Sequence, residues 1–279
     1  MKPAPFAYQR ARTVEEAVAL LGQNTDAKLL AGGQSLISTL NMRLSAPSML
    51  IDINGVNGLG GITHKNGKVE VGALVRHSEA ERSELIAKYA PLIARALPHI
   101  AHPAIRNRGT IGGSIAYADP AAELPACLLA LGGEVVATGP KGARRIAAED
   151  FFKGLFETAL GPQEIVTAIR VPAAIAQTRI GFAELARRHG DYAVVGLAAS
   201  ARAAGRGFAT VRLSFFGVGA TPLRAKKAET ALERSDVDAA VAALDLEPPD
   251  DVQASGAVKR HLAGVLLRRV AKQLTETRL

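Results

Sequence analysis

The stretches Ala31-Gly-Gly-Gln-Ser35 and Thr110-Ile-Gly-Gly-Ser114 decide how this sequence is interpreted, because each combines a glycine pair with nearby hydroxyl side chains. Glycine lets a backbone approach a ligand closely, so that successive N–H groups can converge on phosphate oxygens. Two such turns could hold a dinucleotide pyrophosphate from both sides, whereas either turn alone could be a simple tight connection. Neither turn has the spacing of G-x-G-x-x-G or of a P-loop, which disfavours a NAD-binding Rossmann domain and an NTPase.

The residues around the first turn predict a small α/β unit over about residues 1–57. Thr13 and Glu16 form a capping box at the start of the first helix. Ser35 can cap the second helix through its hydroxyl. Helical spacing and short apolar runs predict helices and strands in alternation, at 14–21, 27–31, 35–44 and 49–53.

The residues around the second turn predict an antiparallel α+β subdomain over about residues 58–175. Asn66-Gly67 is a hairpin turn signal between two short strands. The second glycine pair itself falls in a stretch rich in Pro, Arg and Gly, 101–114, which we expect to be irregular. Helices are predicted at 78–89, 91–99 and 121–131, and strands at 134–138, 144–147 and 165–171.

A C-terminal domain is expected beyond the boundary at 172–178. Gly205-Arg-Gly207 predicts a turn between two strands. The pattern predicts a three-stranded antiparallel sheet followed by helices, with strands at 180–185, 192–202 and 208–218 and helices at 223–234, 237–244 and 257–274.

The composition is that of an ordinary soluble globular protein, with 48% hydrophobic and 22% charged residues among 279. No apolar run reaches the ~18–20 residues of a membrane span, and Met1 to Arg12 lacks the apolar centre of a secretory signal. We therefore expect a cytoplasmic protein. The net charge of +8 comes from scattered basic residues, and aromatics are only 4%, which disfavours nucleic-acid binding. An anionic cofactor, an acidic partner or an ordinary solvated surface all remain compatible with this charge.

The single cysteine, Cys127, cannot form an internal disulfide or hold a metal cluster alone. It lies in an apolar helical stretch and is expected to be a buried packing residue. No metal site is expected, so any redox centre in this chain must be an organic cofactor.

Longer segments around the two turns resemble the flavin motifs of the FAD-binding medium subunits of molybdenum hydroxylases, the family of carbon monoxide dehydrogenase and xanthine dehydrogenase. Ala31-Gly-Gly-Gln-Ser-Leu36 resembles the first motif, and Ile105-Arg-Asn-Arg-Gly-Thr-Ile-Gly-Gly-Ser114 resembles the second. The resemblance continues in order to near the C-terminus, through 118–125, 151–154, 164–165, 187–192 and 217–222. Several independent motifs in the right order make this signal specific.

The resemblance implies an α+β fold with two domains. Residues 1–175 would be an FAD-binding domain of the vanillyl-alcohol oxidase (PCMH) type, made of subdomains at about 1–57 and 58–175. Residues 176–279 would be a C-terminal domain of the CO dehydrogenase flavoprotein type. FAD would bind non-covalently between the two subdomains, since no residue is a candidate for a covalent link.

The resemblance also implies which residues bind FAD. Thirteen positions would wrap the pyrophosphate: Lys28, Leu29, Leu30, Ala31, Gly32, Gly33, Gln34, Ser35, Thr110, Ile111, Gly112, Gly113 and Ser114. Lys28 could equally be a solvated surface lysine. Glu123, nine residues after the second motif, would hold a ribose or adenine-side group, with Asp119 as the competing candidate.

Four further residues are candidates on the same ground. Ile100 and Ile165 would pack against the cofactor or belong to the plain core. Tyr192 would cover one face of the isoalloxazine or anchor the C-terminal domain. His102 would touch the flavin or only a backbone carbonyl.

The function implied is an oxidoreductase subunit that passes electrons from [2Fe-2S] clusters through FAD to an external acceptor. A large partner would carry molybdopterin and a small partner the two clusters, in a dimer of heterotrimers without nucleic acid or a membrane span. No catalytic residue is assigned, because the organic substrate would react on the large partner. One alternative is a stand-alone FAD reductase resembling UDP-N-acetylenolpyruvoylglucosamine reductase, and another is a basic nucleic-acid-binding protein.

Overall fold

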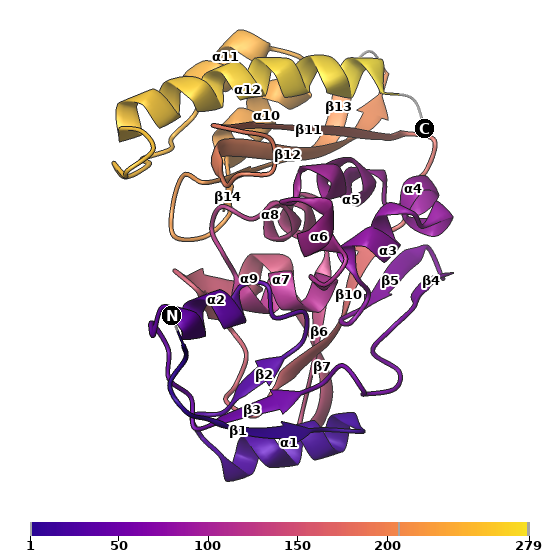
Figure 1. The fold of residues 1–279 in the computed structure, drawn as a ribbon. Helices are drawn as coiled ribbons and strands as arrows, with labels where there is room; N and C mark the ends of the chain where they lie inside the picture. The colour runs from indigo at the N-terminus through magenta and orange to yellow at the C-terminus, as the bar shows by residue number, and fades with distance from the viewer. Residues whose placement is uncertain (1, 206, 278–279) are drawn as a thin grey trace.

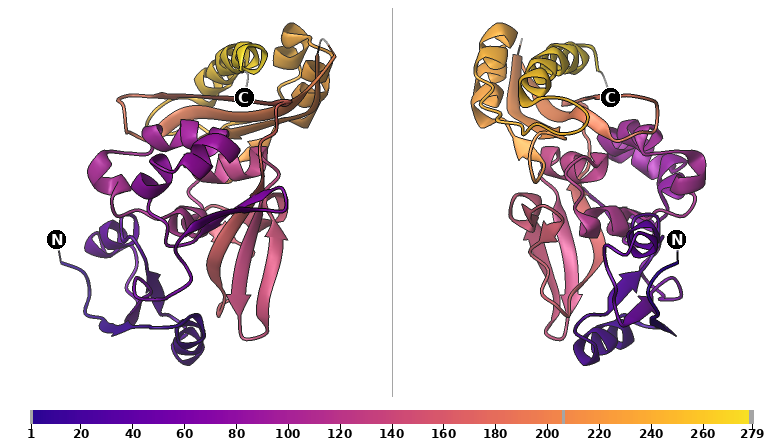
Figure 2. Two further views of the ribbon diagram at one scale, coloured as in Figure 1. Left: turned by 90° about the vertical axis from the view of Figure 1, so that its right-hand side faces the viewer. Right: turned by 60° about the vertical axis from the view of Figure 1, so that its left-hand side comes forward.

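The computed structural model describes residues 2–205 and 207–277 and stacks them as three units (Figures 1 and 2). The indigo N-terminal unit lies at one end of Figure 1, the magenta helices lie in the middle, and the orange-to-yellow C-terminal unit lies at the other end. The fold is α+β, as expected from the sequence.

The N-terminal unit is built on a parallel sheet of order β1-β3-β2. Its strands are β1 (Ala7–Arg10), β2 (Lys28–Leu30) and β3 (Met49–Asp52), and its helices are α1 (Val14–Gln23) and α2 (Leu36–Asn41). The predicted cap is confirmed, since Thr13 Oγ1 accepts from the Glu16 N–H at 3.1 Å. The sequence did not predict β1, because its four residues are all exposed and show no apolar alternation.

The middle unit contains a five-stranded sheet of order β4-β5-β10-β6-β7. Asn66 and Gly67 form the predicted hairpin turn, both with positive φ. The strands are β4 (Ile62–Lys65), β5 (Lys68–Gly72), β6 (Glu134–Gly139), β7 (Gly142–Ala147) and β10 (Ile165–Pro172), with a separate pair β8 (Phe152–Gly154) and β9 (Glu157–Thr158).

Short helices connect and cover these strands. They are α3 (His77–Glu81), α4 (Glu84–Tyr89), α5 (Pro91–Ala96), the 3-10 helix η1 (Leu97–His99), α6 (Pro103–Arg106), α7 (Ile111–Tyr117), α8 (Glu123–Ala130) and α9 (Ala148–Phe151). The single helix predicted over 78–89 is wrong, because α3 ends at Glu81 and Ser83 caps α4 by accepting from the Ile86 N–H.

The C-terminal unit has a four-stranded sheet of order β11-β12-β13-β14, not the three strands expected. Its elements are β11 (Thr178–Ala186), β12 (Ala193–Ala204), β13 (Gly207–Phe216), β14 (Leu223–Arg224), α10 (Lys226–Glu233), α11 (Val237–Ala242) and α12 (Gly256–Glu276). The additional strand arises because Leu223 and Arg224 pair with the end of β13 instead of starting a helix.

Helix α8 lies between the middle and C-terminal units, and all of its residues are buried. It contacts β12 and β13 on one side and α5 and α7 on the other, while α10 and α12 cover the far face of the C-terminal sheet (Figure 2). Cys127 in α8 is fully buried, as predicted. Within the described ranges, no helix has the length and apolar character that crossing a membrane requires.

Candidate cofactor site

The two glycine motifs are in direct contact although they are far apart in sequence. A Cβ added to Gly32 would lie 2.3 Å from the carbonyl oxygen of Arg108 and 2.9 Å from the Cα of Gly109. Only glycine therefore allows the first turn to pack against the backbone that leads into the second motif. The sequence predicted that both turns share one site, and this contact brings them together.

Asn54 and Arg76 tie the two motifs to the sheet. The Asn54 amide donates to the carbonyl of Ala31 at 2.8 Å and accepts from Arg76 Nη2 at 2.7 Å. Arg76 also donates to the carbonyl of Arg108. Burial, and then the nearby Arg108 guanidinium, lower the pKa of Arg76. The sequence analysis missed both residues, although Asn54 follows the carboxyl end of a parallel strand, where ligand sites gather.

The first turn keeps its backbone donors free. In the part of the chain that the structure describes, the N–H groups of Gly32, Gly33, Gln34 and Ser35 donate to no acceptor. Ser35 precedes α2, but its hydroxyl makes no capping bond, so the predicted cap is wrong. The helix was expected to extend to about 44 but ends at Asn41. These four N–H groups and one hydroxyl are therefore available to an anionic ligand.

The second turn is already hydrogen-bonded within the protein. Its glycines lie in the first turn of α7, not in the irregular stretch that we expected. The Gly112 N–H donates to the Ala73 carbonyl at 2.8 Å, and the Gly113 N–H donates to Thr110 Oγ1 at 3.0 Å. A Cβ on Gly112 would lie 2.4 Å from that of Ala73. These glycines therefore serve close packing, and the N–H groups that remain free are those of the first turn.

His77 contacts the N-terminal end of α7. Its Nε2 lies 2.9 Å from the carbonyl oxygen of Thr110, and its ring packs against Gly109. Burial lowers the pKa of His77 to about 4, so the imidazole is neutral at neutral pH and can donate to that carbonyl.

Removing the hydroxyl of Thr110 should lower the free energy of unfolding more than removing that of Ser35. Thr110→Val is expected to lower the free energy of unfolding by about 1 kcal/mol, because the Gly113 N–H loses its acceptor. Ser35→Ala should change it by less than about 0.5 kcal/mol, since no capping bond is lost. Urea denaturation of both variants measures the two free energies of unfolding. Equal losses would contradict the conclusion that Thr110 caps its helix and Ser35 does not.

The aliphatic candidates differ in how much surface they offer. Ile165 is 1% exposed within the core of the N-terminal unit, so its side chain has little free surface for a ligand. Ile100 is 9% exposed and belongs to the core of the middle unit. Lys28 is exposed on β2, and Leu29 and Leu30 are partly buried.

Tyr192 lies where the C-terminal unit meets the middle unit. It is 58% exposed and stands just before β12 rather than inside it. The preceding loop contacts the middle unit, since a Cβ on Gly190 would lie 2.8 Å from the carbonyl oxygen of Ala101 and 2.9 Å from Cε1 of His102. Partial burial, followed by the charge of Asp119, raises the pKa of Tyr192. The predicted residues Tyr192, His102 and Asp119 thus gather at this junction.

The two candidate carboxyl groups have different environments. Asp119 is partly buried and accepts from the Ala121 N–H at 2.9 Å, and burial raises its pKa. Glu123 is 8% exposed, and burial, followed by the charges of Glu184 and Asp119, raises its pKa to about 8. Glu123 is therefore largely protonated at neutral pH.

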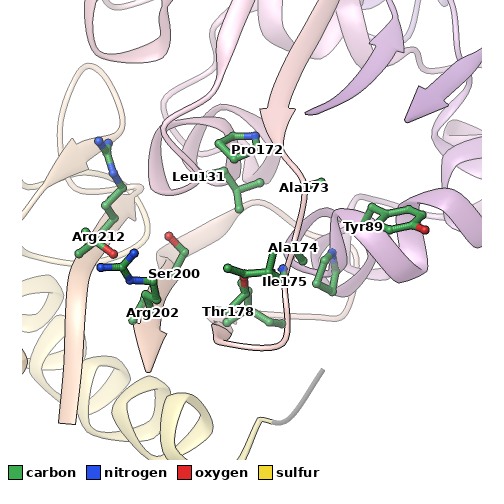
Figure 3. Close-up of a pocket in the computed structure, with 14 residues that line it drawn as sticks. Tyr89, Leu131, Pro172, Ala173, Ala174, Ile175, Thr178, Ser200, Arg202 and Arg212 are labelled. Atoms are coloured by element: carbon green, nitrogen blue, oxygen red, sulfur yellow. The ribbon is translucent and has the colours of Figure 1, made fainter. Parts of the chain in front are cut away.

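Two cavities lie away from these residues. A cavity of about 190 Å³ lies at the link between the middle and C-terminal units, where Tyr89, Pro172, Ile175 and Arg202 line it (Figure 3). A second, of about 280 Å³, lies at Arg10, Ala11, Arg12 and Gly55. None of the candidate residues lines either cavity. The described residues contain no cluster of His, Cys, Asp or Glu that could hold a metal ion.

Comparison with known families agrees with this geometry. Residues 4–174 match the FAD binding domain in molybdopterin dehydrogenase, and residues 180–274 match the CO dehydrogenase flavoprotein C-terminal domain. The fold and site thus define a flavoprotein of the oxidoreductase class. The chain belongs to the family of FAD-binding medium subunits of molybdenum hydroxylases.

Individual relatives match over nearly their full lengths. The chain is 39% identical to 6-hydroxypseudooxynicotine dehydrogenase complex subunit alpha of Paenarthrobacter nicotinovorans, covering 100% of this chain and 97% of that protein. It is 37% identical to the carbon monoxide dehydrogenase medium chain of Hydrogenophaga pseudoflava, covering 96% of both. A solved structure of carbon monoxide dehydrogenase from Hydrogenophaga pseudoflava superposes with a TM-score of 0.97 at 38% identity, covering 100% of both chains. The predicted family, fold and FAD cofactor are confirmed, and a stand-alone reductase is not favoured.

Proposed function

We propose that this chain is the FAD-binding electron-transfer subunit of a heterotrimeric molybdenum hydroxylase. In this role it passes electrons from [2Fe-2S] clusters through FAD to an external acceptor. The observation that carries the proposal is the row of free N–H groups at 32–35, packed against the second flavin motif in a chain that matches a medium-chain relative over 96% of both lengths.

The first motif would bind the pyrophosphate of FAD. Four free N–H groups, the Ser35 hydroxyl and the nearby Arg76 and Arg108 form a positive surface suited to two phosphates. Residues 110–114 would act mainly by fixing the backbone against which this turn packs, with the Ser114 side chain as an additional contact. Residues 28–31 would position the turn from the end of β2.

The isoalloxazine would lie at the junction where Tyr192 and His102 meet. Tyr192 offers an exposed aromatic face and a hydroxyl there. Ile100 is close to His102 in the sequence. Asp119 is the better candidate to accept from a cofactor hydroxyl, because it is less buried than Glu123. When bound, FAD supplies the exchange between one-electron and two-electron transfer, so this chain needs to bind and orient it and requires no catalytic residue.

The partners would be a large molybdopterin-binding subunit and a small subunit with two [2Fe-2S] clusters, in a cytoplasmic dimer of heterotrimers. Exposed apolar side chains on and after α2 support docking of a protein close to the first motif: Ile37, Met42 and Leu44 are 39%, 59% and 74% exposed. We also propose the domain limits 1–175 and 176–279, with subdomains at 1–57 and 58–175.

A tagged pull-down from the native host tests this function. We expect the purified material to contain two further chains and to show flavin and iron–sulfur absorption together. Flavin on a single chain would favour a stand-alone reductase instead. A complex that contains both partners but no flavin would contradict the proposal.

A further inference from the structure

Two side-chain amides hold backbone carbonyl groups of the first turn. Asn54 Nδ2 donates to the carbonyl of Ala31 at 2.8 Å, and Gln34 Nε2 donates to the carbonyl of Gly32 at 3.0 Å. Asn54 follows β3, whereas Gln34 belongs to the turn itself. Both amides are partly buried, so each of these carbonyl oxygens is fixed by a donor from inside the protein.

Holding these two carbonyls also sets the direction of two of the free N–H groups. The C=O of one residue and the N–H of the next belong to one planar peptide unit, and in a trans unit they point in opposite directions. The described residues contain no cis peptide bond. The bonds from Asn54 and Gln34 therefore direct the N–H groups of Gly32 and Gly33. Gly33 has a φ of 73°, the left-handed conformation that occurs where successive N–H groups form an anion-binding concavity.

The Asn54 amide uses both of its N–H bonds within the protein. Besides the Ala31 carbonyl, its Nδ2 donates to Asp52 Oδ1 at 2.7 Å, and its Oδ1 accepts from Arg76 Nη2 at 2.7 Å. This orientation of the amide follows from its partners, because a carboxylate only accepts and a guanidinium only donates. Asn54 can therefore act on a ligand only through the groups that it holds.

Hydrogen bonds fix Asn54 to both the N-terminal and the middle unit. On β1, the Tyr8 hydroxyl donates to Asp52 Oδ2 at 2.5 Å, and Asp52 Oδ1 also accepts from the Asn54 backbone N–H at 2.8 Å. On the other side, Arg76 stands at the start of α3 and also donates to the carbonyl of Arg108, just before the second motif. A continuous row of hydrogen bonds thus runs from Tyr8 to Arg108, with Asn54 at its centre.

We propose that Asn54 and Gln34 are positioning residues for the pyrophosphate of FAD. By holding the carbonyls of Ala31 and Gly32, they turn these partially negative oxygens away from the phosphates and present the N–H groups of Gly32 and Gly33 instead. Asn54 does this without touching the cofactor. This inference rests on the proposed function and names two side chains that act on FAD through the backbone.

Asn54→Leu and Gln34→Met test this role, since each replaces an amide by an apolar side chain of similar size. Titration of the full chain with FAD, followed by flavin fluorescence, should show that each variant binds about 10-fold more weakly, the effect of one lost hydrogen bond. Asn24→Leu is the matched control, because Asn24 Nδ2 donates to the carbonyl of Leu20 at 3.0 Å in the same kind of bond outside the site. It should bind FAD as the wild type does. Gln34→Met carries the test alone if Asn54→Leu does not fold.

Phosphorus NMR at saturating FAD separates positioning from mere support of the fold. The phosphorus signals of bound FAD depend on the hydrogen bonds to the phosphate oxygens, so they should shift in Asn54→Leu and Gln34→Met and stay in place in Asn24→Leu. The visible absorption bands of the flavin should be the same in all four proteins. Unchanged FAD affinity in both variants would overturn the proposal, and so would weaker binding without a shift of the phosphorus signals.

Inorganic pyrophosphate distinguishes a failure of this inference from a failure of the proposed function. A wild type that binds FAD as tightly as Asn54→Leu and Gln34→Met would overturn only the inference. A wild type that takes up no FAD would overturn the proposed function, and calorimetry with inorganic pyrophosphate would then test the turn by itself. Tighter pyrophosphate binding by the wild type than by Gln34→Met would support the positioning role, whereas equal binding or none would overturn it.

Discussion

Gly32→Ala is expected to weaken FAD binding by about 100-fold, which corresponds to about 2.7 kcal/mol. The new Cβ would lie 2.3 Å from the Arg108 carbonyl oxygen and 2.9 Å from both the Arg108 carbonyl carbon and the Gly109 Cα. All of these atoms are backbone, so no side chain can rotate away, and the first turn must move from the second motif. The free N–H groups at 32–35 then lose the placement that a pyrophosphate requires.

Titration of the purified variant with FAD, followed by flavin fluorescence, measures this effect. The free energy of unfolding should also fall, by about 1–3 kcal/mol, because the clash strains a packed contact. Gly60→Ala is the matched control, since nothing lies within 4 Å of a Cβ at that position and its φ is not in the left-handed region. If Gly32→Ala bound FAD as tightly as Gly60→Ala, the contact between the motifs would not be what positions the pyrophosphate.

The sequence predicted local structure well wherever short-range chemistry determines it. Thr13 caps α1, Asn66-Gly67 forms a hairpin turn, and Cys127 is buried. Each of these follows from residues within a few positions of one another. The break in the helix predicted over 78–89 was missed because Ser83 is polar and helix-compatible, and only its observed bond to the Ile86 N–H shows that it starts a new helix.

The sequence predicted which two motifs form the site, but not which of them has free N–H groups. Both glycine pairs were expected to offer N–H groups to phosphate, yet those of Gly112 and Gly113 are used inside the protein. Their acceptors include the carbonyl of Ala73, which is distant in sequence. Asn54 and Arg76 were missed for the same reason, because their importance comes from tertiary hydrogen bonds between separate segments.

The charge state of Glu123 could not be read from its position in the sequence. A glutamate near a helix start usually lies at the surface and is ionised. Here α8 is covered on both sides, by α5 and α7 and by the C-terminal sheet, so the carboxyl group is buried. Its protonation is thus a consequence of how the units stack.

Arg106→Met is expected to lower the free energy of unfolding by about 3 kcal/mol. The Arg106 guanidinium is buried and binds both carboxylate oxygens of Glu81, at 2.9 and 3.3 Å. It also donates to the carbonyls of Ile100 and Ala101, each at 3.1 Å. Methionine fills similar space but leaves the carboxylate and both carbonyls without their donor. Ala101 has a positive φ of 44°, so the segment that carries Ile100 and His102 should relax once it is released, and FAD binding should weaken with it.

Arg144→Met separates this effect from the simple loss of an arginine. Arg144 binds both oxygens of Glu164, at 2.6 and 2.7 Å, in the same bidentate geometry, but its side chain is 48% exposed against 10% for Arg106. Solvent screens an exposed ion pair, so this substitution should cost at most about 1 kcal/mol. Urea denaturation at low and high salt compares the two variants. If the two variants lost equal stability, the bonds from Arg106 to the carbonyls of Ile100 and Ala101 would not be what holds this segment in place.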